Sequence, residues 1–131
     1  MRALLWLYIA LFATLTVLSV LDPGATGTAA EMTFDLVVDV IALIGLVAYA
    51  VRLNAPRMIA AWKYVAPALL VAFVLQMVVA WPDLMAPDPE LSSAEHYGIV
   101  GLALAAGVLL LTPAVIVNFR FARGRHLDAA R

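Results

Sequence analysis

The sequence predicts an all-α, membrane-spanning four-helix bundle with both termini on the cytoplasmic side. Of the 131 residues, 66% are hydrophobic and only 13% are charged, whereas about 25% of the residues in an average soluble domain are charged. The apolar residues form four long stretches, and the basic and acidic residues gather at opposite ends of those stretches. These three observations predict one integral membrane domain that covers residues 1–131.

The predicted spans are the four stretches long enough to cross a bilayer, residues 3–21, 34–53, 58–81 and 97–119. At ~1.5 Å rise per residue, each covers the ~30 Å hydrocarbon core as a helix, which satisfies its own backbone hydrogen bonds in lipid. Pro, Gly, Asn or Ser occur in every connection. Thr28 with Glu31 and Ser92 with Glu95 match S/T-x-x-E capping boxes, so the second and fourth helices are expected to begin there, ahead of their apolar spans.

The first span also resembles a secretory signal peptide. Arg2 precedes an apolar run, and Gly27 and Ala29 supply small residues for a cleavage site. Residues 3–21 exceed the ~7–15 residues of a usual h-region, so an intact first helix is the favoured interpretation. Cleavage of residues 1–29 would leave three spans with unchanged orientation.

Charge asymmetry predicts the orientation. The basic residues lie before the first span, around the second connection, or after the fourth span: Arg2, Arg52, Arg57, Lys63, Arg120, Arg123, Arg125 and Arg131. All acids except Asp128 lie in or beside the first and third connections. Because Lys and Arg are retained in the cytoplasm during insertion, we expect cytoplasmic termini and a multi-pass protein of the plasma membrane, the inner membrane of a bacterium.

Two carboxylates enter the second span. Asp35 and Asp39 are one turn apart on one helix face, and at ~1.5 Å per residue Asp39 lies ~7–8 Å below Phe34, within the hydrocarbon. An ionisable group at this depth is a candidate functional residue. With His96 at the outer end of the fourth span, Asp39 and Asp35 form a candidate ion or proton site. The alternative is that Asp35 and His96 are solvated and Asp39 is hydrogen-bonded to a neighbouring Thr, Tyr or water.

Small and polar residues in the third and fourth spans predict close helix contacts. Gly98, Gly101, Ala105 and Gly107 provide small-residue spacings that let helix backbones approach in lipid. The spacings do not distinguish contact within the chain from dimerisation. Gln76, in the third span, is expected to form an interhelical hydrogen bond.

Aromatic and basic side chains at the inner boundary predict lipid-headgroup anchors, namely Trp62, Lys63, Arg120, Arg123 and Arg125. Lys63 has an apolar stem that lets its charge reach the headgroups. The three arginines follow the fourth span, where cations complement both the helix dipole and anionic lipid, and Gly124 is a candidate helix cap. This short tail offers no fold for nucleic-acid binding, which is not expected.

Several chemistries are excluded by residue type and spacing. The sequence has no cysteine, so disulfides, thiolate metal sites and iron–sulfur clusters are ruled out. His96 and His126 are predicted on opposite sides of the membrane, which argues against a bis-histidine haem. No phosphate-binding loop, nucleophile elbow, HExxH or dinucleotide motif occurs. We therefore expect no catalytic residue, metal or cofactor, and an enzyme is the less favoured class.

The centre of the chain resembles small uncharacterised bacterial four-span membrane proteins. Between Asp39 and Lys63, "LIGLVAYA" is followed by a short basic loop and "AAWKY". The resemblance implies that Gly45, Tyr49, Trp62 and Lys63 are structural signatures of the inner hairpin, and it implies no substrate.

Two functions follow from these observations. The first is an accessory or helix-packing partner in a membrane complex, in contact with the lipid bilayer and with other membrane-protein subunits or a second copy of itself. The alternative is a small proton- or cation-linked transporter or channel-like oligomer that uses Asp39.

Overall fold

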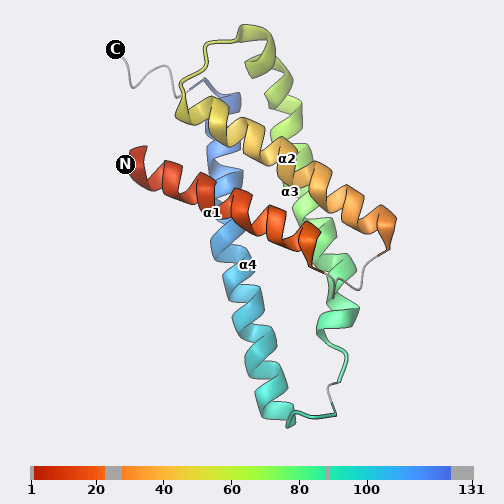
Figure 1. The fold of residues 1–131 in the computed structure, drawn as a ribbon. Helices are drawn as coiled ribbons and strands as arrows, with labels where there is room; N and C mark the ends of the chain where they lie inside the picture. The colour runs from red at the N-terminus through yellow and green to blue at the C-terminus, as the bar shows by residue number, and fades with distance from the viewer. Residues whose placement is uncertain (1, 23–27, 88, 125–131) are drawn as a thin grey trace.

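Four long α-helices make up the computed structural model, which describes residues 2–22, 28–87 and 89–124 (Figure 1). They are α1 (Arg2–Leu21), α2 (Ala29–Ala50), α3 (Pro56–Leu84) and α4 (Ser93–Ala122). Each helix is long and apolar enough to cross a membrane. The predicted all-α, four-span architecture is therefore confirmed.

Capping boxes start α2 and α4, as predicted. Thr28 accepts a hydrogen bond from the Glu31 amide at 3.2 Å, and its own amide donates to the Glu31 carboxylate at 2.6 Å. Ser92 and Glu95 form the same pair of bonds at 3.4 and 3.0 Å. Both glutamates lie ahead of the apolar spans that begin at residues 34 and 97. Hydrogen bonds from Thr28 lower the pKa of Glu31, with the larger contribution from the Thr28 backbone and the smaller one from its side chain. Hydrogen bonds from Ser92 lower the pKa of Glu95, with the larger contribution from the Ser92 side chain and the smaller one from its backbone.

The ends of α2 and α4 use a left-handed residue to stop the helix. Arg52 has φ 55°, and the Leu53 amide donates back to the Ala48 carbonyl at 2.9 Å. This Schellman-type closure ends α2 at Ala50, earlier than the predicted limit of the span at residue 53. Gly124 has φ 67°, and its amide donates to the Phe121 carbonyl at 2.9 Å, so Gly124 ends α4 as predicted.

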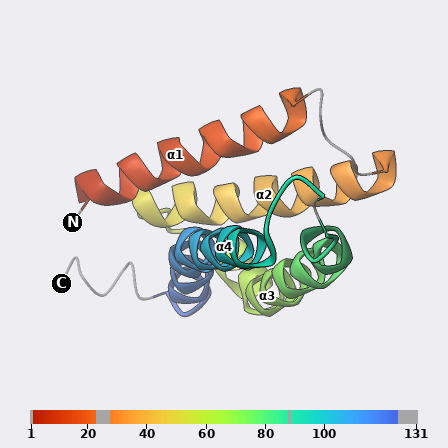
Figure 2. The ribbon, with the colours of Figure 1, turned by 90° about the horizontal axis from the view of Figure 1, so that it is seen from below.

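The helices form two hairpins that cross steeply, with α2 in the middle (Figures 1 and 2). Helix α1 packs mainly on α2, whereas α2 contacts α1, α3 and α4. The start of α1, the α2–α3 connection and the end of α4 lie toward the upper left of Figure 1, where most cations are found, and we name this the basic end. The opposite side, where α1 and α3 end, is the acidic end. Which end faces the cytoplasm stays a prediction.

The core lies where the hairpins cross and extends toward the basic end. Nine buried residues form the main cluster, Ile9, Phe12, Val38, Ala42, Leu46, Ala50, Leu69, Phe73 and Ala114. A second cluster comprises Ala48, Trp62, Ala66, Phe121 and Ala122. Helix α1, which the signal-peptide alternative would remove, thus supplies two residues of the main cluster. Many large apolar side chains remain exposed on all four helices and contact lipid in a bilayer.

Candidate functional site

A buried hydrogen-bonded junction joins α2, α3 and α4 near the basic end. The Trp62 indole N–H donates to Asn118 Oδ1 at 2.7 Å, and Asn118 Nδ2 donates to the carbonyls of Ala42 at 3.3 Å and Ala114 at 2.8 Å. Asn118 is only 1% exposed. Because a polar amide without partners is costly inside a membrane, this complete set of bonds ties the three helices together. We call Gly45, Trp62 and Asn118 the polar junction.

Gly45 makes the space for these bonds. A Cβ atom built on Gly45 would lie 1.9 Å from Asn118 Oδ1 and 2.7 Å from Trp62 Nε1. Real Cβ atoms do not approach other atoms so closely, so any side chain at position 45 would push the amide and the indole apart. The position therefore requires glycine for close approach.

Trp62 differs from the lipid-facing anchor that the sequence predicts. The residue is 8% exposed, and its ring packs edge-on against Phe121 with a centroid distance of 5.7 Å. Its N–H finds a partner inside the protein instead of at a headgroup, because Asn118 presents an oxygen on the facing helix. Asn118 itself was not predicted. The available signal was an amide in an otherwise apolar span, spaced by four from Ala114 and by three from Phe121.

Asp39 is held between α1 and α2, partly buried. The buried Thr16 hydroxyl lies 3.1 Å from Asp39 Oδ2 and 3.0 Å from the Phe12 carbonyl oxygen. A hydroxyl carries one hydrogen, so the charged carboxylate has to share it with the carbonyl. A protonated Asp39 would instead donate to Thr16, which would then donate to Phe12. The Tyr8 hydroxyl donates to the Leu110 carbonyl and fixes α1 to α4 as well.

Asp35 has a different partner from Asp39. Gln76 Nε2 of α3 donates to Asp35 Oδ1 at 2.8 Å, which confirms the predicted interhelical bond of Gln76. Glu31, Asp35 and Asp83 line the rim of a cavity of about 450 Å³ between the start of α2 and the end of α3. Within the described part of the chain, no three His, Cys, Asp or Glu residues are placed to hold a metal ion.

His96 does not join the aspartates. Its Nε2 atom is buried and has no hydrogen-bond partner among the described residues, and its ring contacts the Tyr97 ring with a centroid distance of 5.8 Å. The hydrogen bond of Asp39 goes to Thr16 of α1. The structure therefore does not assemble the proposed site of Asp39, Asp35 and His96 through hydrogen bonds, because Asp39 faces α1 and His96 stands at the start of α4.

The predicted helix-packing residues divide into two groups. A Cβ on Gly107 would lie 2.8 Å from the Met77 side chain, so Gly107 lies at the contact of α4 with α3. A Cβ on Gly98 or Gly101 would meet nothing within 4 Å, and Ala105 is exposed. Gly98 and Gly101 thus have open space where a side chain would lie, and Ala105 presents its side chain to the surroundings.

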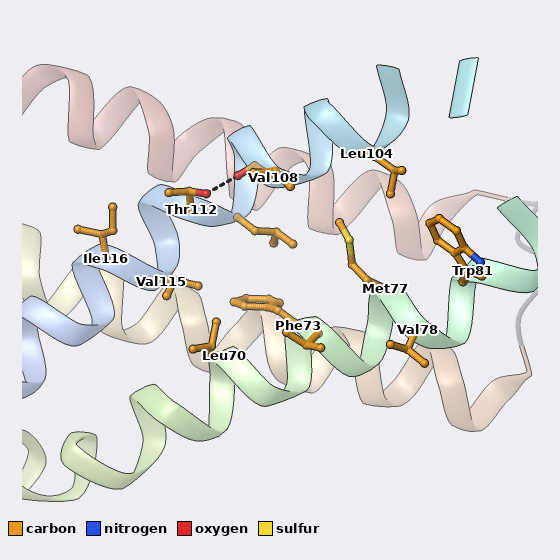
Figure 3. Close-up of a pocket in the computed structure, with 12 residues that line it drawn as sticks. Leu70, Phe73, Met77, Val78, Trp81, Leu104, Val108, Thr112, Val115 and Ile116 are labelled. Carbon is orange, nitrogen blue, oxygen red and sulfur yellow. Dashed lines mark hydrogen bonds between the residues drawn. The ribbon is translucent and has the colours of Figure 1, made fainter. Parts of the chain in front are cut away.

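An apolar groove continues from these small residues. It lies between α3 and α4, has a volume of about 600 Å³, and is lined by apolar side chains apart from Thr112 (Figure 3). In Figure 3 the Thr112 hydroxyl donates to the Val108 carbonyl of its own helix, at 2.6 Å. Steps of three or four residues connect the small residues to this groove on one side of α4. We name this side the α4 face, which comprises Gly98, Gly101, Ala105, Val108 and Thr112.

The predicted basic anchors remain on the surface. Lys63, Arg120 and Arg123 are exposed, and Arg125 lies outside the described residues. Tyr49 is partly buried against the second cluster. Headgroup contact by Lys63, Arg120, Arg123 and Arg125 stays a prediction.

Comparisons with protein-family models, curated proteins and solved structures find no match for this chain. The fold and its apolar surface define the class on their own. The protein is a small polytopic membrane protein whose four helices contact the lipid bilayer.

Proposed function

We propose that the protein is a non-catalytic accessory subunit that receives a transmembrane helix of another membrane protein on its α4 face. The observation that carries this proposal is the unpartnered stripe of small residues that continues into an apolar groove. Small side chains let two helix backbones approach closely, which is the main source of helix association in lipid.

A pull-down in mild detergent tests this function with matched variants. Ala105→Leu adds bulk to the α4 face, whereas Ala106→Leu makes the same change at an exposed position about a quarter turn away. We expect a stoichiometric partner to co-purify with the wild type and with Ala106→Leu. Ala105→Leu should reduce its recovery by about tenfold or more, because overpacking an interface costs about 1–3 kcal/mol. Equal recovery with both variants, or no partner at all, contradicts the proposal.

A cross-linking experiment tells whether the helix on the α4 face belongs to a different subunit or to a second copy of this chain. The sequence has no cysteine, so Gly101→Cys introduces a single thiol on the α4 face. Rapid disulfide formation between two copies in native membranes would identify a homodimer and overturn the proposal of a different subunit. The absence of the disulfide, together with a co-purified protein, supports it.

Proton- or cation-linked transport by Asp39 is the second candidate. It is supported by the position of Asp39, a partly buried carboxyl group within an apolar span that is hydrogen-bonded to the buried Thr16 hydroxyl. Asp39→Asn keeps an acceptor for Thr16 and removes the titratable group. In proteoliposomes, we expect Asp39→Asn to lower proton or cation flux by about tenfold or more while Asp35→Asn retains it. Unchanged flux in Asp39→Asn would exclude this candidate.

We also propose that the basic end faces the cytoplasm of a cell with the protein in its plasma membrane. The proposal follows from the excess of Lys and Arg at that end. A reporter fused after Arg131 should be active only in the cytoplasm. Reporter activity outside the cell would show that the basic end faces outward and would overturn this proposal.

A further inference from the structure

A cavity of about 720 Å³ opens at the basic end, between the start of α3 and the end of α4. Lys63 and Arg123 bring two cations to its lining, and Asn54 adds an amide. The rest of the wall is largely apolar and includes Ile59, Ala60 and Phe119. The cavity thus combines positive charge with an apolar surface close to the ends of two apolar helices. We call these six residues the basic groove.

We propose that the basic groove is a specific binding site for one anionic phospholipid. The phosphate lies between Lys63 and Arg123, and the upper part of an acyl chain lies along Ile59, Ala60 and Phe119. This site is separate from the α4 face and does not depend on the identity of a helix partner.

Charge complementarity favours an anionic ligand. Among the described residues that line the groove are both cations and no carboxylate, so the described wall of the groove carries a net positive charge. A guanidinium donates several N–H groups to phosphate in a fixed fork, and the lysine supplies a mobile point charge. Basic pockets between transmembrane helices bind lipid headgroups by this combination.

The start of α3 adds to the positive potential. Ala55 precedes α3 and offers no side-chain cap, and Pro56 occupies the first turn. The partial positive charge of the helix N-terminus is therefore not offset by a capping side chain, in contrast to the capping boxes of α2 and α4. This contribution supports the two cations, which carry the argument.

The apolar wall distinguishes a lipid from a free phosphate ion. A free ion gains nothing from contact with Ile59, Ala60 and Phe119, whereas an acyl chain exchanges one apolar neighbour for another and remains in the hydrocarbon. Lys63 has the long apolar stem needed to follow that chain and keep its ammonium group at the headgroup.

Native mass spectrometry of the delipidated protein in mild detergent tests the site. Phosphatidylglycerol and phosphatidylcholine with identical acyl chains are titrated separately. We expect one phosphatidylglycerol to bind about tenfold or more tightly than phosphatidylcholine. Lys63→Gln and Arg123→Gln should each weaken phosphatidylglycerol binding by about tenfold, the effect of losing one charge-assisted hydrogen bond.

Two neighbouring cations provide the matched control. Arg57 and Arg120 are exposed on the same helices near the basic end but do not line the groove. Arg57→Gln and Arg120→Gln should change phosphatidylglycerol binding by less than about twofold, because neither exposed side chain contacts the bound lipid. Equal losses in the control pair and the groove pair would show unspecific charge attraction and overturn the proposal.

A charge-neutral variant and a soluble competitor complete the test. Ala60→Trp fills the apolar wall, and we expect it to weaken phosphatidylglycerol binding by about tenfold while both cations remain. Inorganic phosphate at millimolar concentration should not displace the lipid. Full displacement by phosphate, or unaltered binding in Ala60→Trp, would show that no acyl chain occupies the groove. Ala60, Lys63 and Arg123 are all exposed, and unchanged thermal unfolding of each variant confirms that the fold is intact.

Discussion

Glycine has opposite roles at the polar junction and on the α4 face. At the polar junction, Gly45 admits the Trp62–Asn118 bond, and a Cβ there would lie 1.9 Å from the amide oxygen. On the α4 face, a Cβ at Gly101 would meet nothing within 4 Å. Both glycines lie in long apolar helices and look alike in the sequence. One closes a contact within the chain, and the other leaves a surface open.

This difference separates what holds the chain together from what it offers to other molecules. Lipid replaces the side chains of an absent helix almost without cost, because acyl chains are as apolar as leucine. A buried amide has no such substitute and must find its partners within the protein. The polar junction therefore specifies how α2, α3 and α4 meet, whereas the α4 face tolerates change in the isolated chain.

Exchange of Gly45 for alanine is expected to have the largest effect, and the same exchange on the α4 face a small one. Gly45→Ala should lower the free energy of unfolding by about 2–4 kcal/mol, since it forces overpacking and breaks the Trp62–Asn118 bond. Gly98→Ala and Gly101→Ala should be neutral or stabilising by up to about 1 kcal/mol, because alanine is the better helix former. Unfolding in detergent by denaturant titration measures all three. If Gly45→Ala left the free energy of unfolding unchanged, the proposed difference between Gly45 and the glycines of the α4 face would be wrong.

The polar junction can be sharpened by a double-mutant cycle. Asn118→Leu removes the amide and leaves the indole N–H of Trp62 without its acceptor, at an expected cost of about 1–3 kcal/mol. Trp62→Phe removes the donor. The coupling free energy between the two substitutions should be about 1 kcal/mol, within the range measured for bonds between membrane helices. Trp81→Phe, on an exposed tryptophan, should change stability by less than about 0.5 kcal/mol. Strict additivity of Asn118→Leu and Trp62→Phe would mean that the bond adds nothing.

The features predicted correctly from the sequence were local or one-dimensional. The four long apolar helices follow from hydropathy along the chain, and the Thr28–Glu31 box follows from two residues three apart. Gln76 was correctly expected to bond across helices because an amide in lipid has few other options.

The features that escaped prediction depend on which side of a helix faces the protein. Trp62 was assigned to the headgroups from its depth alone, and depth does not show that its indole points at Asn118. The expected link between Asp39 and His96 assumed that both faced one interior. The packing of α1 on α2 instead places Asp39 against Thr16 of α1, and no sequence pattern within one helix encodes which neighbour that face meets.

The contact of α1 with α2 should prove weaker than the polar junction. Thr16→Val keeps the shape of the side chain and removes the hydroxyl next to Asp39, so we expect a loss of about 0.5–1.5 kcal/mol. Thr14→Val is the matched control, because the exposed Thr14 hydroxyl donates to the Ala10 carbonyl of its own helix and not to a described residue of α2. Its effect should stay below about 0.5 kcal/mol. Equal effects of the two substitutions would mean that the hydroxyl at Asp39 does not hold α1 in place.

The smallest expected effect lies in the connection beside the polar junction and has the opposite sign. Arg52 adopts φ 55° at the end of α2, a conformation that costs a residue with a Cβ about 1 kcal/mol and glycine almost nothing. Arg52→Gly should therefore stabilise the protein by up to about 1 kcal/mol, less any gain in the entropy of the unfolded chain. Arg52→Gln removes the same charge but keeps the Cβ, so it should bring no gain. Denaturant titration of both variants separates backbone strain from charge. If only Arg52→Gln raised the free energy of unfolding, the cause would be repulsion among the cations of the basic end. The backbone conformation of Arg52 at the end of α2 would then not be the source of strain.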